Sequence, residues 1–377
     1  MKRTISTTVA RDLRKKMVFL TGPRQAGKTT LSRDLMAQVG AGQYLNYDVA
    51  EDRAVIESGQ WDRRAPLLVL DEIHKMPMWK NWLKGVYDGK IAEQQILVTG
   101  SARLDTFRQS GDSLAGRFFA LRLHPLSVRE WCEQTGATPE AALTHLLERG
   151  GFPEPCLAET KDEAERWRRQ YFDGLVRNDV LEFSRLQELQ SMRLLAEMLR
   201  SRVGSPLSLA SISRDLHLAP TTLKKYLDIL EALYIVFIVR PWHRNIARAT
   251  LQAPKVYFYD TGLVIGDNGI RYENLVACAL LKHVEYLHDT QGQETALHYI
   301  RTKDGAEVDF ALSSGLELTD LVECKLTDPK PHHALARFAQ EWPQAKAVQL
   351  VRDLRQPRAF ASLSVVAAAP WLAALAA

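Results

Sequence analysis

Short apolar runs alternate with amphipathic stretches along the first 150 residues of the chain. Four largely apolar runs are strand candidates: residues 17–20, 44–47, 67–70 and 96–99. Turn or helix-starting residues follow each run, and strands that alternate with helices are typical of a parallel sheet covered on both faces. We therefore expect an α/β fold with a parallel sheet here, and residues 118–123 are a candidate fifth strand.

The pattern becomes helical after residue 151. A short helix is expected over residues 209–216, and Pro220 stands where the next helix begins. That second helix has an apolar face at three- and four-residue spacing, formed by Leu223, Tyr226, Leu227, Leu230 and Leu233. The β-rich runs 234–239 and 255–259 then complete the pattern of a winged helix.

Helix and strand patterns alternate again in the last third of the chain. We therefore expect three domains: a parallel-sheet domain in residues 1–150, a helical linker with a winged helix in 151–260, and a second α/β domain in 261–377.

The composition, 46% hydrophobic and 25% charged over 377 residues, is that of an ordinary globular protein. Four scattered cysteines do not form a disulfide framework, which fits a reducing compartment. The N-terminus is polar before any apolar run, unlike a secretory signal. The uncharged residues 360–377 are alanine-rich and contain Pro370, so a buried strand and a short terminal helix are expected rather than a membrane span. These features predict a cytoplasmic protein that does not enter a membrane.

Residues 22–29 match the phosphate-loop pattern G-x-x-x-x-G-K-[ST] without a mismatch. A predicted strand precedes the motif and a helical pattern follows it, as this motif requires. The glycines let backbone N–H groups curl around phosphates at a helix N-terminus. We expect Lys28 to reach the β- and γ-phosphates and Thr29 to bind Mg²⁺, with ATP and Mg²⁺ as cofactors. The expected nucleotide-binding residues are Gly22, Pro23, Arg24, Gln25, Ala26, Gly27, Lys28, Thr29 and Thr30.

Asp71 and Glu72 end the buried run 67–70 about forty residues after this loop. We expect Asp71 to hold Mg²⁺, directly or through water, and Glu72 to act as the general base that polarises the attacking water.

The run 96–99 is also followed by polar residues, so Ser101 or Thr99 is expected near the γ-phosphate as a sensor, although a simple exit from the strand has the same pattern. Arg117 is a candidate for the guanidinium that stabilises the transition state, with Arg103 and Arg108 as alternatives.

The phosphate loop, the Leu-Asp-Glu-Ile-His-Lys strand end, Thr-Gly-Ser-Ala-Arg and Leu-Ala-Gly-Arg-Phe resemble the motifs of prokaryotic AAA-type ATPases fused to a C-terminal domain of unknown function, the DUF4143 group. Residues 149–154, 259–263 and 273–276 agree with this resemblance, which covers nearly the whole chain. In that family the C-terminal domain is similar to the PD-(D/E)XK, or restriction-endonuclease-like, fold and follows a winged helix.

A second group of acidic residues lies in the last third. Glu323 and Lys325 share one face of a predicted strand, since side chains alternate with period two. With Asp309 and the helix-borne Glu273, Glu323 could hold Mg²⁺, and Lys325 could orient a water or a phosphate. A solvent-facing charged hairpin has the same short pattern. The resemblance implies a nuclease-like fold and leaves cleavage open.

Charge is unevenly distributed. Residues 191–250 carry nine Lys and Arg against four acids, whereas residues 261–330 carry six against twelve. A basic winged helix favours DNA contact, although such helices also pack domains together. Lys224 and Lys225 are the best candidates for contacts to phosphates or a groove.

Two hypotheses follow. In the first, ATP hydrolysis gates DNA engagement by the winged helix and a Mg²⁺-dependent nuclease-like domain. In the second, the protein is an ATP-dependent switch in defence or toxin regulation, and its C-terminal fold binds a partner without cleaving. Both hypotheses are compatible with a homo-oligomer in which an arginine of a neighbouring subunit completes the ATPase site.

Overall fold

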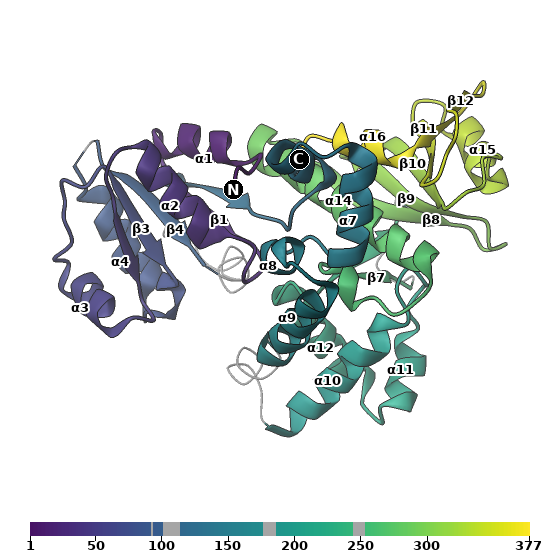
Figure 1. Ribbon diagram of the computed structural model, residues 1–377. Helices are drawn as coiled ribbons and strands as arrows, with labels where there is room; N and C mark the ends of the chain where they lie inside the picture. Colours follow the sequence, from purple (N-terminus) through teal and green to yellow (C-terminus); the bar gives the residue numbers. More distant parts are fainter. Residues whose placement is uncertain (92, 101–113, 176–185, 244–252) are drawn as a thin grey trace. The chain divides into compact units, whose positions relative to one another are not determined.

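The computed structural model describes the chain except for residues 92, 101–113, 176–185 and 244–252. It divides into two compact units, Met1–His124 and Pro125–Ala377 (Figure 1). The division lies before the predicted boundary at residue 150, because the helices that follow residue 124 pack with the C-terminal part.

The first unit contains a five-stranded parallel sheet in the order β2-β3-β4-β1-β5. The strands are β1 (Met17–Thr21), β2 (Gln43–Asn46), β3 (Leu67–Asp71), β4 (Gln95–Thr99) and β5 (Phe118–Arg122). The helices are α1 (Ser6–Leu13), α2 (Lys28–Gln38), α3 (Ala50–Ser58), η1 (Ile73–Lys75) and α4 (Trp79–Asp88). The parallel sheet and its strands agree with the prediction from the apolar runs.

Helices cover both faces of this sheet, which explains why β1 and β3 are apolar at nearly every position. Phe19 and Leu70 face one apolar cluster with residues of α3 and α4. Leu20 and Val69 face the opposite cluster with residues of α1 and α2. Because successive side chains alternate between faces, a single strand contributes to both clusters.

The second unit begins with helices and continues into an eight-stranded sheet in the order β12-β13-β11-β10-β9-β8-β6-β7. The helices before the sheet are α6 (Val128–Thr135), α7 (Pro139–Arg149), α8 (Pro153–Leu157), α9 (Lys161–Gly174), α10 (Leu186–Arg200), α11 (Leu209–Asp215) and α12 (Pro220–Ala232). The strands are β6 (Val236–Pro241), β7 (Lys255–Phe258), β8 (Thr295–Arg301), β9 (Glu307–Ser314), β10 (Glu317–Lys325), β11 (Lys346–Val351), β12 (Arg358–Ala359) and β13 (Ser364–Ala367). The remaining elements are η4 (Thr261–Leu263), α14 (Asn268–Gln291), α15 (His333–Glu341) and α16 (Ala368–Ala373).

Strands β6 and β7 pair antiparallel, where the sequence predicts the wing of a winged helix. The same β6 also pairs parallel with β8, with Arg240 opposite His298. The two strands therefore form one edge of the C-terminal sheet, and the predicted middle and C-terminal domains share a sheet within one compact unit. The distinction between these domains has no counterpart in the sheet because strand pairing joins segments that are separate in sequence.

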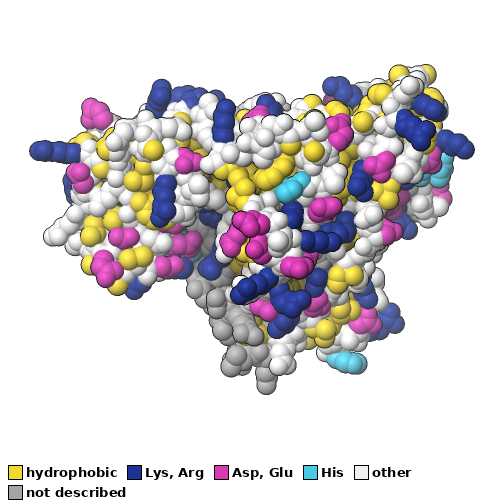
Figure 2. All heavy atoms as spheres, in the orientation of Figure 1, with side chains coloured by type: hydrophobic (Ala, Val, Ile, Leu, Met, Phe, Trp, Pro, Cys, Tyr) yellow, Lys and Arg dark blue, Asp and Glu magenta, His cyan; other side chains and the backbone are white. Residues whose placement is uncertain are grey.

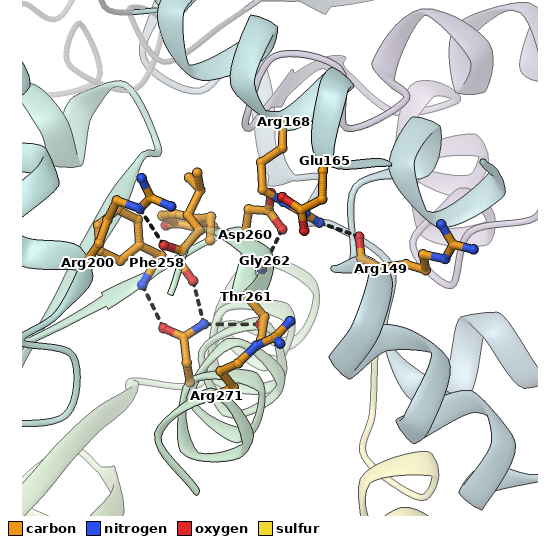
Figure 3. A network of polar contacts seen from close by, with 12 residues as sticks. Arg149, Glu165, Arg168, Arg200, Phe258, Asp260, Thr261, Gly262 and Arg271 are labelled. Atoms are coloured by element: carbon orange, nitrogen blue, oxygen red, sulfur yellow. Dashed lines mark hydrogen bonds and ion pairs between the residues drawn. The ribbon is translucent and has the colours of Figure 1, made fainter. Parts of the chain in front are cut away.

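A buried ion pair joins α9 to the turn that follows β7 (Figure 3). Arg168 Nε lies 2.7 Å from Asp260 Oδ2, and the two side chains are 2% and 1% exposed. Arg168 also donates to the carbonyl of Arg149 at the end of α7, and Gly262 N donates to Asp260 Oδ1. Two of the sequence landmarks that carry the family resemblance, residues 149–154 and 259–263, therefore meet at this one interaction.

Two glycines make room for the pair. A Cβ at Gly262 would lie 2.0 Å from Arg168 Cζ, and a Cβ at Gly150 would lie 2.2 Å from Asp260 Oδ1. Gly150 also has a φ of 75°, which disfavours other residues. These landmarks are thus explained by packing around a buried charge.

Within the described ranges, no helix is both long and apolar enough to cross a lipid bilayer. The uncharged C-terminal segment forms β13 and α16, as predicted.

We expect Arg168→Met to lower the free energy of unfolding by roughly 3–5 kcal/mol, because it leaves the Asp260 carboxylate buried without its cation. Adding Asp260→Asn should recover part of this loss. Arg202→Met, which breaks an exposed pair with Asp215, should cost less than about 1 kcal/mol. Urea unfolding curves measure all three. Equal midpoints for Arg168→Met and Arg202→Met would contradict the assignment.

Candidate functional site

The loop between β1 and α2 is tightly wound around its glycines. Gly22 has a φ of 139° and Gly27 a φ of 99°. A Cβ at Gly22 would lie 2.3 Å from the carbonyl oxygen of Leu123, so the backbone leaves no space for a side chain there. The loop ends at α2, an 11-residue helix that begins at Lys28. Backbone N–H groups at such a helix start are suited to bind an anion.

Lys28 folds back over this loop. Its Nζ donates to the carbonyls of Gly22 and Pro23, at 2.9 Å and 2.7 Å. The ammonium group is therefore held at the loop, where a phosphate bound by the loop would meet it.

Asp71 ends β3 and lies opposite Thr99 in the β3–β4 pairing. Thr99 Oγ1 donates to Asp71 Oδ1 at 2.6 Å. The hydroxyl of Tyr44, on β2, contacts Asp71 Oδ2 and also bonds the Thr29 side chain. Thr29 and Asp71 thus approach one common point, and their oxygens are the kind of donor that Mg²⁺ prefers. Thr29 and Asp71 therefore stay the predicted ligands of the first metal site.

Tyr44 was not anticipated as a site residue. It lies in a predicted strand, but its contact with Asp71 depends on the pairing of β2 with β3, which a single run does not reveal.

Glu72 follows Asp71 with a φ of 56°, in the left-handed region. Its Oε2 has no hydrogen-bond partner, and His74 Nε2 and Lys75 Nζ lie 3.5 Å and 3.9 Å from it. Burial raises the pKa of Glu72, and the neighbouring Asp71 charge raises it further. A non-glycine residue with a positive φ, such as Glu72, is often found at functional positions. The geometry suits a carboxylate that accepts a proton from water.

Arg117 does not reach this site within its own chain. It precedes β5, and its carbonyl accepts from Met17 N at the start of β1. The phosphate loop follows the opposite end of β1, about 16 Å away along a five-residue parallel strand. Arg117 instead pairs with Asp88. The alternatives Arg103 and Arg108, and the sensor candidate Ser101, lie outside the described residues.

The second acidic group comes together at β9, β10 and α14. Asp309 N donates to Glu323 Oε2 at 3.3 Å, and Cys324 N donates to Asp309 Oδ2 at 2.8 Å. Burial and the Asp309 charge raise the pKa of Glu273 to about 7 and that of Glu323 to about 8. The structure therefore brings the predicted Glu273, Asp309, Glu323 and Lys325 into one electrostatic cluster.

These carboxylates have internal partners. Glu323 Oε1 accepts from Lys325 Nζ at 2.6 Å, and Glu273 Oε1 accepts from the Tyr257 hydroxyl at 2.7 Å. A Cβ at Gly204 would lie 2.7 Å and 2.9 Å from the two Glu273 oxygens, so backbone closes over that carboxylate. Mg²⁺ usually keeps several waters, which need space.

In the part of the chain that the structure describes, no three His, Cys, Asp or Glu side chains form a group that could hold a metal ion. Glu273, Asp309 and Glu323 thus do not fit a hydrated Mg²⁺.

Lys224 and Lys225 are exposed near the start of α12. Lys225 Nζ lies 3.6 Å from Glu188 Oε2, and its side chain is 55% exposed. Both lysines are accessible to a charged ligand, and their predicted role in DNA contact stays a prediction.

Three family models match successive parts of the chain. Residues 14–132 match an AAA domain, residues 140–272 match a domain of unknown function (DUF8612), and residues 268–369 match a domain of unknown function (DUF4143).

Two curated relatives are uncharacterized proteins. One, from Mycobacterium tuberculosis, is 31% identical over 253 residues, which are 66% of this chain and 55% of the relative. This chain thus spans about half the length of that relative. The other, from Haemophilus influenzae, is 24% identical over 298 residues, covering 70% of this chain and 74% of the relative.

Solved structures with some similarity include a Walker-type ATPase of Pyrococcus abyssi, with 12% identity, a TM-score of 0.44, and coverage of 72% of this chain and 94% of that one. RuvB of Thermotoga maritima has 16% identity, a TM-score of 0.34, and coverage of 63% and 89%. The match over residues 14–132 and the loop geometry agree. The chain therefore contains an AAA-type P-loop ATPase-like domain, which supports ATP binding and hydrolysis, followed by a DUF4143 domain.

Proposed function

We propose that this protein is an ATP-hydrolysing switch that acts on DNA, in which the nucleotide state of the first unit controls DNA engagement by the second. The observation that carries the ATPase part is the arrangement of Lys28, Asp71 and Glu72 around one phosphate loop. The DNA part is supported by the exposed lysines of α12.

The phosphates of ATP lie against the backbone N–H groups of the loop and the start of α2. Lys28 exchanges the carbonyls of Gly22 and Pro23 for phosphate oxygens, so its charge is available without a large movement. Thr29 and Asp71 would hold Mg²⁺, which neutralises charge on the phosphates. Tyr44 and Thr99 keep the Asp71 carboxylate oriented by bonding one oxygen each.

Glu72 orients the attacking water and accepts its proton through its carboxylate, whose pKa is raised by burial and by the Asp71 charge. Lys75 lies 2.5 Å from Asp48 Oδ2 and 3.9 Å from Glu72 Oε2. Lys75 therefore places a positive charge beside Glu72 and links Glu72 to Asp48 in the loop after β2. The carboxylate stays near the phosphate loop, where the charge of Lys28 favours its ionised form.

DNA engagement is assigned to the start of α12. Helix α11, the following turn and α12 are arranged in sequence as in a helix-turn-helix, and Lys224 and Lys225 extend from the first turns of α12. On the face shown in Figure 2, basic and acidic side chains are interspersed. We expect Lys224 and Lys225 to make local contacts with phosphates at this helix.

A second candidate function is an ATP-dependent switch whose DUF4143 domain binds a protein partner without cleaving anything. It is favoured by the internal pairing of Glu273 and Glu323, which leaves these carboxylates neutralised. A Mg²⁺-dependent nuclease step forms no part of either proposal, because these side chains do not fit the metal.

Lys28→Ala should weaken ATP binding at least about tenfold, because the phosphates lose their buried cation. Glu72→Gln should bind ATP normally and hydrolyse it about 10²- to 10⁴-fold more slowly, the usual contribution of a general base. Nucleotide binding by fluorescence and phosphate release measure the two effects. Glu51→Gln, an exposed change on α3, is the control and should behave as wild type. Normal turnover by Glu72→Gln would contradict its assignment.

DNA should change the ATP turnover rate, and one of single-stranded, duplex or branched DNA should do so most strongly. Lys224→Gln/Lys225→Gln should weaken binding and reduce the slope of log affinity against log salt by about 2, since each lysine contributes about 1. Fluorescence anisotropy at several salt concentrations measures this slope, with Lys161→Gln on α9 as the control. A rate that is unchanged by every DNA form would exclude the DNA proposal and favour the partner-binding candidate.

A further inference from the structure

Lys255 is a lysine buried next to the acidic cluster of the second unit. Its side chain is only 1% exposed, which is rare for lysine unless the charge is paired. Lys255 Nζ lies 2.6 Å from Glu307 Oε1 and 3.6 Å from Glu273 Oε1. The ammonium group also lies 5.2 Å from the centre of the Tyr299 ring. Carboxylates and an aromatic face thus surround a positive charge that solvent does not reach.

The backbone pairing of strand β7 fixes the position of Lys255. Lys255 is opposite Val239 of β6, and it also forms a bridge with Pro206. Tyr257 lies two residues further on, so its side chain leaves the same face of the strand. The Tyr257 hydroxyl donates to the same Glu273 oxygen that Lys255 approaches. One strand therefore supplies both an ammonium and a phenol to one carboxylate.

Three cations pair with three of the four acids of the cluster, and the Asp309 carboxylate accepts a hydrogen bond from Cys324 N. Lys255 serves Glu273 and Glu307, Lys325 serves Glu323, and Arg301 lies 2.7 Å from the second oxygen of Glu307. A divalent ion at Glu273 would stand close to the Lys255 ammonium, and like charges repel strongly in a buried site. The backbone at Gly204 closes another side of this carboxylate.

We propose that Lys255 is a built-in cation that takes the place of a metal ion, so that the acidic cluster of the DUF4143 domain is complete without divalent metal. The cluster holds α14, β7 and the β9–β10 hairpin together through these ion pairs and hydrogen bonds. A domain built in this way has no metal to activate water for phosphodiester cleavage. The inference concerns the second unit alone and does not depend on ATP or DNA binding by the protein.

Mn²⁺ binding to the full-length protein without nucleotide tests this proposal. Electron paramagnetic resonance reports free and bound Mn²⁺, and Asp309→Asn is the matched comparison because the phosphate loop is the same in both proteins. We expect identical Mn²⁺ titrations for wild type and Asp309→Asn. A wild-type site that Asp309→Asn removes would overturn the proposal, as would Mn²⁺-dependent DNA cleavage that is lost in the same variant.

Lys255→Met tests the cation itself. Once the ammonium is gone, Glu273 and Asp309 should gain a Mn²⁺ site at least about tenfold tighter than any in the wild type, and Lys255→Met/Asp309→Asn should lose it again. Lys303→Met, an exposed lysine between β8 and β9, is the control and should gain nothing. A folded Lys255→Met protein that binds no additional Mn²⁺ would also overturn the proposal.

If Lys255→Met does not fold, the wild-type comparison with Asp309→Asn decides alone. These outcomes are separate from those of the ATPase assays. A DNA-stimulated ATPase with an Asp309-dependent Mn²⁺ site would overturn this inference and leave the proposed function intact.

Discussion

The buried ion pair between Arg168 and Asp260 is the interaction on which the second unit depends most. Its partners come from α7, α9 and the turn after β7, and two glycines are required so that the charges can meet. A buried carboxylate without this cation would be strongly destabilising. Because Asp260 follows β7 almost directly, the pair also anchors the strand that carries Lys255 and Tyr257 into the acidic cluster.

The two units use charge in opposite ways. In the first unit, a lysine rests on backbone carbonyls, and a buried glutamate keeps one oxygen without a hydrogen bond. Lys28 and Glu72 both lie beside the loop that we propose to bind the phosphates. In the second unit, Lys282 and Arg168 each meet a buried carboxylate of the protein itself, and the buried Lys255 meets two partly exposed ones. Charges that are already paired stabilise one arrangement and offer little to a metal ion.

This difference in charge pairing agrees with our proposal that the first unit hydrolyses ATP and the second unit responds to it. Phosphoryl transfer depends on positioning and on stabilising charge, both of which the phosphate loop and Asp71 can provide. A switch also needs a part that responds without doing chemistry of its own. A domain whose main buried charges are held in ion pairs, such as Arg168 with Asp260 and Lys282 with Glu130, can change its outer contacts without breaking them.

Much of the first unit could be predicted from local patterns. The glycines around residues 22–27 and the apolar runs that end at Asp71 and Thr99 are local features, because a tight turn and a strand buried on both faces constrain every residue within them. The cluster of Glu273, Asp309, Glu323 and Lys325 was also expected, since alternation along a strand and the family resemblance both indicated it. The prediction that this cluster binds Mg²⁺ also required space around the carboxylates, which the residue types alone do not reveal.

Only the tertiary structure decided the contacts between segments that are distant in sequence. Lys255 is separated from Glu307 by several elements, and only the packing of β7 against its neighbours brings the two together. The same holds for Tyr44 beside Asp71, for β6 joining the C-terminal sheet, and for Arg117 beside the start of β1, at the opposite end of that strand from the phosphate loop. The sequence by itself determined the strands and the phosphate loop of the first unit, because these depend on neighbouring residues. Charge pairing and strand order depend on which surfaces fold against each other, and this is set by the burial of the whole core.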